Sequence, residues 1–303
     1  MAMEAWVAVS FCVATTIAFV GSLYLWPNPH LLDRDHPTII KRRLVSVVAV
    51  SVVGTCVLWT LSPLTVGSLA TSMGLVPPCG ACVGSVGGGD GVGEVWEELD
   101  DVSWGAVLGG CGLPFVSALI LPLAGCVGCF AGPLVMEWMD QDLPGMRNYP
   151  LSHLGSWISI RNLVVAPVAE EYVFRALFMA ALSQAGFSPF SSIALPPLLF
   201  GMAHLHFVLD GRSLASLGLQ LGYTSIFGAF SGLLFHATSS LYPPILVHAF
   251  CNFMGFPDFD ALLSHKHKHI LIPVLLAGVV VFFALFSTIT SRQSYLYPQS
   301  RCS

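Results

Sequence analysis

The chain has 303 residues, of which 55% are hydrophobic and 10% are charged, and its formal net charge is −5. Its mean hydropathy is +0.76. Ordinary soluble domains carry roughly 25% charged residues, so too few polar side chains remain here to cover a water-soluble globule. The composition therefore predicts an integral membrane protein. The sequence has no basic patch interleaved with aromatic residues, and we expect no nucleic-acid partner.

Apolar segments occur along most of the chain. About 20 such residues cross the hydrocarbon core, and about eight segments meet this requirement. The first, 5–26, ends at the interfacial aromatic residues Tyr24 and Trp26. A cleaved signal peptide is the alternative there, although no basic region precedes it. The other predicted spans are 44–61, 104–136, 157–182, 190–209, 213–236, 241–256 and 270–289, with a shorter apolar piece at 64–76.

Two regions of the chain depart from simple apolar helices. The span 104–136 contains Pro114, Pro122 and Pro133, so a tilt or a kink is expected in it. Residues 77–103 are rich in glycine and acid and predict a loop outside the membrane. We find no internal repeat and no separate soluble domain. The prediction is a single all-α membrane domain over 1–303, whose roughly eight helices enclose a polar cavity within the membrane.

Lysine and arginine indicate the orientation, because they gather on the cytosolic side. If the predicted spans alternate in direction, nine basic residues share one side: Arg34, Lys41, Arg42, Arg43, Arg147, Arg161, Arg212, Lys266 and Lys268. Only Arg292 and Arg301 fall on the other side. The first side is therefore predicted to be cytosolic, and the termini and the 77–103 loop to be lumenal or external.

Three charged residues interrupt the apolar stretch "APVAEEYVFRALFMA" at positions 166–180. A charge at membrane depth costs roughly 2.5–3.5 kcal/mol on insertion scales, and it usually faces the interior of a bundle. Glu171 and Arg175 are spaced i, i+4, which permits a structural ion pair. Glu170 points about 100° away from Glu171 and has no cation one helical turn away. It must find partners on other helices, or water.

Histidines on later spans supply such partners. "FGMAHLHF" places His204 and His206 at the end of the fifth span, and "HAFCNF" places His248 and Asn252 one turn apart on the seventh. A single histidine on an apolar span is more often a hydrogen-bonding or interfacial residue than a catalyst. Side chains from three spans that can converge favour a shared site. The "HKHKH" run at 265–269 reads as a solvated loop without an assigned role.

This set of side chains suits the activation of water. A glutamate in a partly dehydrated site has a raised proton affinity, which is useful in a general base. A neighbouring neutral histidine can orient the attacking water. A second histidine and an amide can donate hydrogen bonds to an oxyanion. The inventory fits hydrolysis of an amide bond.

The three strings together resemble the motifs of type II CaaX prenyl endopeptidases, within the larger ABI or CPBP family. They are "EExxxR" at Glu170, "FxxxH" ending at His204, and "HxxxN" at His248, and the resemblance covers about 150–256. It implies a multi-pass enzyme of the endoplasmic reticulum with its site open to the cytosolic side. That enzyme removes the last three residues of farnesylated or geranylgeranylated CaaX proteins, such as small GTPases, in contact with membrane lipid.

The resemblance also assigns residue roles. It implies that Glu170 and His204 act on the catalytic water and that His248 and Asn252 bind the oxyanion. For His206 the resemblance implies an accessory role. The implied mechanism needs no cofactor, and we expect none.

Other functions stay open at this point. Zinc held by the histidines and glutamate is a less favoured alternative, because no HExxH string is present. The Cys79/Cys82 and Cys126/Cys129 pairs have metal-ligand spacing, but the second pair lies in an apolar span. A non-catalytic scaffold of the same wider family is a second possibility. A proton-coupled transporter is a third, although transporters often show internal repeats.

Overall fold

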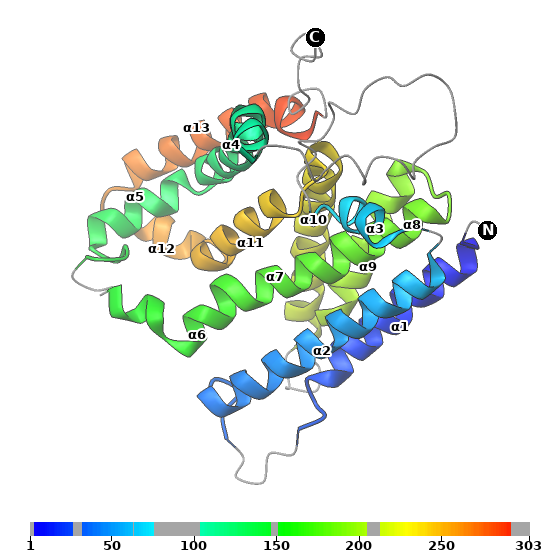
Figure 1. Cartoon of the computed structure of the whole chain (residues 1–303). Coiled ribbons are helices and arrows are strands. Elements are labelled where there is room, and N and C mark those ends of the chain that lie inside the picture. Colours follow the sequence, from blue (N-terminus) through cyan, green and yellow to red (C-terminus); the bar gives the residue numbers. More distant parts are fainter. Residues whose placement is uncertain are drawn as a thin grey trace.

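The computed structural model describes residues 3–26, 32–62, 64–75, 104–146, 151–204 and 213–291. Within these ranges every regular element is a helix, which confirms the all-α fold (Figure 1). The predicted loop at 77–103 lies outside the described residues, and so does His206.

The N-terminal helices follow the first predicted spans closely. α1 covers Ala5–Ser22, α2 covers Pro37–Leu61, and the short α3 covers Val66–Ser72. α2 begins before the predicted apolar span at 44 because His36 caps it and Pro37 occupies its first turn, where a missing N–H costs nothing. The basic residues at 41–43 therefore lie on the helix rather than in a loop.

The predicted span at 104–136 is bent, as its prolines indicated. α4 covers Trp104–Cys129 and α5 covers Ala131–Asp140, with an angle of 70° between the two helices. Pro133 lacks the N–H that would bond to the Cys129 carbonyl four residues earlier, which accounts for a bend at this point. The predicted kink is confirmed.

The stretch that carries the two glutamates is helical from Trp157 to Gln184. It follows the short 3₁₀ turn η2 (Leu151–Gly155) and consists of α6 (Trp157–Ile160), η3 (Arg161–Val165), α7 (Ala166–Glu171), η4 (Tyr172–Leu177) and α8 (Phe178–Gln184). η3 and η4 are π-helical turns. Such turns are rare in proteins overall, but those that occur are often found at functional sites. Nothing in the hydrophobic pattern predicted them.

The described part of the C-terminal half contains five helices. They are α9 (Pro189–Ala203), α10 (Leu214–Thr238), α11 (Tyr242–Met254), α12 (Phe259–Ser264) and α13 (Lys268–Thr290). Ser188 and Ser213 cap α9 and α10, since each hydroxyl accepts a backbone N–H in the first turn. α12 falls between two predicted spans and was not anticipated.

The number of long apolar helices is smaller than the predicted eight. Among the described residues, α1, α2, α10 and α13 are long and apolar enough to cross a membrane, and the bent α4–α5 pair would be a fifth span. α9 has 15 residues and α11 has 13, fewer than the roughly 20 that a span needs. Both pack against several other helices, so their lengths need not match the bilayer. The fold is still that of a multi-pass membrane protein.

The core lies around η4 and α8. Phe174 and Phe178 are fully buried, and Phe174 packs edge-on against Phe19 and Phe200 with ring centroids 6.0 and 5.1 Å apart. α8 packs against α1 and α9, and η4 packs against α2, α9 and α10. The preceding α7 lies between α2 and α11 (Figure 1), and it contacts both. Residues 173–182 are buried, Arg175 included, and the packing therefore fixes the position of the adjacent glutamates.

α4 and α13 cross at two glycines, and this crossing yields the first prediction. A Cβ added to Gly278 would lie 1.9 Å from the Gly128 carbonyl oxygen. Gly278→Ala should therefore push the helices apart and lower thermal stability in detergent, by about 1–3 kcal/mol as for other overpacked sites. Gly218→Ala in α10 is the matched control, because no atom lies within 4 Å of the added Cβ. Equal melting temperatures for the two variants would contradict the close crossing.

Candidate active site

The two neighbouring glutamates at the end of α7 have different environments. Glu171 is completely buried, whereas the Glu170 side chain keeps 22% of its exposure. Adjacent helical residues point about 100° apart, so one carboxylate faces the packed interior and the other faces a more open region. The two groups can therefore have different functions.

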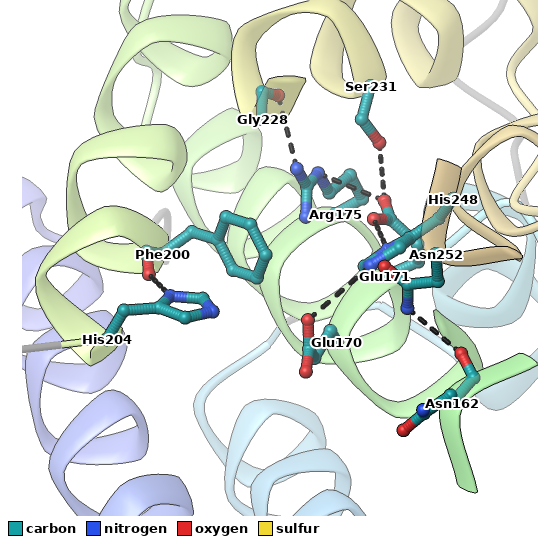
Figure 2. A network of polar contacts seen from close by, with 10 residues as sticks. All are labelled: Asn162, Glu170, Glu171, Arg175, Phe200, His204, Gly228, Ser231, His248 and Asn252. Atoms are coloured by element: carbon teal, nitrogen blue, oxygen red, sulfur yellow. Dashed lines mark hydrogen bonds and ion pairs between the residues drawn. The ribbon is translucent and has the colours of Figure 1, made fainter. Parts of the chain in front are cut away.

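Glu171 binds side chains from three different elements. Arg175 Nε in η4 lies 3.1 Å from Glu171 Oε2, and the Ser231 hydroxyl in α10 donates to the same oxygen at 2.5 Å. His248 Nδ1 in α11 lies 2.7 Å from Oε1. Figure 2 shows these groups converging on the carboxylate. A charge buried this deeply is tolerated only when it is paired and hydrogen-bonded, and the network meets both conditions.

Arg175 is itself held on two further sides. Its Nη2 donates to the Gly228 carbonyl at 3.2 Å, and the guanidinium lies 5.0 Å from the centroid of the Phe200 ring. The side chain is 1% exposed. The i, i+4 pair suggested by the spacing is thus present, and it is locked into the packing between η4, α9 and α10.

His248 lies between both glutamates. Its Nε2 is 3.7 Å from Glu170 Oε2, on the opposite side of the ring from the bond to Glu171. Phe227 packs against the ring with centroids 4.9 Å apart. Because Glu171 also accepts from Ser231 and faces Arg175, it is an anionic acceptor, and His248 Nδ1 must be the donor. Nε2 then accepts a hydrogen bond in the neutral ring and donates one in the charged ring.

His204 follows directly after α9 and has a defined tautomer. Its Nδ1 lies 2.8 Å from the Phe200 carbonyl oxygen. A carbonyl can only accept, so Nδ1 carries the proton and Nε2 is the acceptor of the neutral ring. In Figure 2 the other ring nitrogen lies on the side that faces Glu170. This arrangement suits a histidine that orients a water molecule beside the carboxylate.

Asn252 is anchored by an irregularity of the backbone. Its Nδ2 donates to the Asn162 carbonyl at 2.9 Å. In the π turn η3 the Ala166 N–H bonds to the Arg161 carbonyl, and the next residue, Pro167, has no N–H to offer to Asn162. The Asn162 carbonyl is therefore free for a side chain from α11. One N–H of the Asn252 amide is used, and the second can bind a ligand.

Several residues of this network were not expected from the sequence. Ser231 and Asn162 belong to no motif, and their partners lie on other helices. Pro167 gave only a partial signal, because in a regular α-helix it would leave the carbonyl of Leu163 without a donor. The π turn η3 moves the free carbonyl to Asn162. Within the described ranges no group of three or more His, Cys, Asp or Glu side chains is arranged to hold a metal ion. The Cys79/Cys82 pair lies outside those ranges.

The "HKHKH" segment, which received no functional role, lies apart from this network. His265 Nε2 is 3.3 Å from Asp140 Oδ1 at the end of α5. The rings of His265 and His267 have centroids 5.6 Å apart. The contact of His265 joins the turn between α12 and α13 to the end of α5, and it involves none of the candidate catalytic residues.

Comparisons with known proteins identify relatives over nearly the whole chain. Residues 152–254 match the family described as "Type II CAAX prenyl endopeptidase Rce1-like". The chain is similar to CAAX prenyl protease 2 of Homo sapiens, with 33% identity over 313 residues, which covers 96% of this chain and 83% of the human protein. CAAX prenyl protease 2 of Arabidopsis thaliana is 40% identical over 164 residues, or 51% of this chain and 50% of the plant protein.

A third relative and the solved structures complete the comparison. The probable CAAX prenyl protease 2 of Schizosaccharomyces pombe is 34% identical over 166 residues, which covers 51% of this chain and 61% of that protein. No solved structure matches the chain. The similarity to the human protein extends well beyond the three motifs, and the chain therefore belongs to the family of type II CAAX prenyl endopeptidases.

Proposed function

We propose that this protein is an intramembrane endopeptidase that removes the C-terminal aaX tripeptide from prenylated CaaX proteins. Its relatives are named CAAX prenyl proteases. The observation that carries the proposal is the approach of both glutamates to His248, at 3.7 Å for Glu170 and 2.7 Å for Glu171. Carboxylates and an imidazole in an otherwise apolar bundle supply a base and a donor where an amide bond can be hydrolysed.

Glu170 acts as the general base. It takes a proton from a water molecule, oriented by His204 Nε2, while the water oxygen attacks the carbonyl carbon of the scissile amide. The electron pair of the carbonyl moves to its oxygen, and the oxyanion accepts hydrogen bonds from His248 Nε2 and the Asn252 amide. When this electron pair returns and the carbonyl re-forms, the C–N bond breaks. The proton held by Glu170 then passes to the leaving amine.

Glu171 has a positioning role in this scheme rather than a purely structural one. To donate from Nε2, His248 must carry protons on both nitrogens, because Nδ1 already donates to Glu171. The anionic Glu171 stabilises this charged ring. Removal of one oxyanion donor typically costs about 10²–10³ in rate, so the bond to Glu171 contributes to catalysis through His248.

No metal is needed for these steps, and a metal-free mechanism is the one we propose. Zinc is the alternative, with the histidines and Glu170 as ligands. A non-catalytic scaffold or a proton-coupled transporter is not favoured, because the named relatives are proteases.

Substrates and location follow from the same proposal. Farnesylated or geranylgeranylated small GTPases are the expected substrates, with membrane lipid around the prenyl chain. Such proteins are made in the cytosol, so the site should open to the cytosolic side of the endoplasmic reticulum membrane. The concentration of lysine and arginine on one predicted side supports this orientation.

The second prediction separates the two glutamates. Glu170→Gln keeps the shape of the side chain but removes the base, so kcat should fall about 10²–10⁴-fold with little change in melting temperature. Glu171→Gln leaves the buried Arg175 unpaired, which typically costs about 3–5 kcal/mol, and should lower both stability and activity. Activity on a farnesylated CaaX peptide and thermal unfolding in detergent measure the two effects.

The double variant Glu171→Gln with Arg175→Met is the control for this comparison. It removes both charges of the buried pair and should recover part of the stability that the single change loses. Substantial turnover by Glu170→Gln would contradict its role as base. A Glu171→Gln protein that is fully stable yet inactive would mean that Glu171 acts only in the active site and does not support the fold.

The third prediction concerns metal dependence. If Glu170 and His204 act on water directly, purified protein treated with a strong chelator should retain most of its peptidase activity. The measurement is the rate of tripeptide release before and after treatment, with a zinc peptidase as the positive control. Loss of activity that added zinc restores would establish the metal mechanism instead.

The fourth prediction concerns topology. In a cysteine-free background, a cysteine at Lys266 should react with an impermeant thiol reagent in sealed microsomes, because the 265–269 segment is expected to face the cytosol. A cysteine placed in 77–103 is the opposite control and should react only after permeabilisation. The reverse labelling pattern would overturn the proposed orientation.

A further inference from the structure

Arg161 is a cation on the helical stretch that carries Glu170. Its Nη1 donates to Asp35 Oδ1 at 2.6 Å, and its Nε donates to Asn162 Oδ1 at 2.9 Å. Arginine has five N–H donors, and Nη2 takes part in neither of these bonds. The side chain keeps 20% of its exposure. The guanidinium is therefore able to bind a further anionic group.

The backbone connects Arg161 to the candidate oxyanion site. The next residue in η3, Asn162, accepts the Asn252 amide through its carbonyl at 2.9 Å. η3 and α11 pack against each other along this region. A peptide that extends from Glu170 towards the start of η3 would have Asn252 beside it and Arg161 near its end.

The separation between Glu170 and Arg161 suits an aaX tail. Glu170 lies nine residues after Arg161, which is about 13.5 Å along an α-helix. The π turn η3 shortens this distance, because it places more residues in each turn. A three-residue peptide spans at most about 10–11 Å when extended. Both side chains lean toward the N-terminal end of the helix, so the separation of the two groups stays close to that of the backbone. An extended tail would bring its carboxylate near the guanidinium that Asp35 and Asn162 hold.

The charges around Asp35 favour a second anion. Arg34 Nε lies 3.6 Å from the same Asp35 oxygen that binds Arg161. The hydrogen bond from Arg161, with the nearby charges of Arg34 and Arg43, lowers the pKa of Asp35. Asp33 accepts the Asp35 backbone N–H and is the other acidic group of this loop. The three guanidinium groups of Arg34, Arg43 and Arg161 therefore outnumber the two carboxylates of Asp33 and Asp35. The local net charge is positive.

Two other cations near the helical stretch are less suitable. Arg175 is 1% exposed and is engaged by Glu171. Lys41 Nζ lies 4.5 Å from the centroid of the Trp157 ring, and a lysine lacks the planar fork that binds both oxygens of a carboxylate. Arg161 combines a partly exposed side chain with the planar guanidinium that can bind both oxygens of a carboxylate.

We propose that Arg161 binds the free α-carboxylate of the aaX tail and thereby sets the number of residues that are removed. This inference rests on the proposed protease activity. The bound carboxylate would lie beside Asp35, which is 45% exposed, so its charge would not have to be buried deep among the helices. The free carboxylate is the feature that distinguishes a true C-terminus from an internal sequence.

The test compares two farnesylated CaaX peptides, one with a free C-terminal carboxylate and one with a carboxamide. Wild-type protein should prefer the carboxylate by about 10–100-fold in kcat/KM, the range of one charge-assisted hydrogen-bonded contact. Arg161→Gln should lose this factor on the carboxylate and change little on the amide, so the preference disappears. Arg161→Lys should keep an intermediate preference, because it retains the charge without the fork.

Asp35→Asn is the matched control, because it breaks the ion pair but keeps Arg161. It should retain the preference for the carboxylate. Equal losses on both peptides in Arg161→Gln, or the same defect in Asp35→Asn, would show that the pair only supports the fold and would overturn the inference. So would a wild-type protein that cleaves both peptides equally well. Failure of wild-type protein to cleave either peptide would overturn the proposed function instead.

Discussion

The buried carboxylate of Glu171 is the group on which the candidate site depends. It joins Arg175 in η4, Ser231 in α10 and His248 in α11. An isolated carboxylate in this position would cost several kcal/mol, so each partner must be in place for the others to be stable. The same contacts that satisfy the charge also fix the His248 ring beside Glu170. Folding and site assembly are therefore coupled through one residue.

Irregular backbone makes the second half of the site. The π turn η3 and Pro167 leave the Asn162 carbonyl without a backbone donor, and Asn252 on α11 supplies one. A regular α-helix would use that carbonyl internally, and α11 would lose this polar contact. The irregularity costs little folding free energy here, because the Asn252 side chain replaces the missing N–H donor. It also brings Asn252 and Arg161 to the same stretch of helix.

Aromatic packing surrounds these polar groups. Phe200 lies against Arg175 and His204, and Phe227 lies against His248. Rings exclude water from most directions, and the low local dielectric strengthens the hydrogen bonds within the network. The buried residues 173–182 hold Phe174 against Phe200, so the core packing reaches the site directly. Glu170, with 22% of its side chain exposed, is the carboxylate that remains open to water.

The sequence by itself determined the class of the protein and the parts of the site that depend on local spacing. Composition indicates a helical membrane protein, the i, i+4 spacing brings Glu171 to Arg175, and the prolines of 104–136 predict the bend between α4 and α5. These features depend on residues near one another in the chain. The lengths of α9 and α11, and the bonds of Glu171 to Ser231 and His248, depend on how distant helices pack. Apolar periodicity indicates that a helix is buried, but it does not indicate which other helix packs against it. Only the tertiary structure decided these contacts.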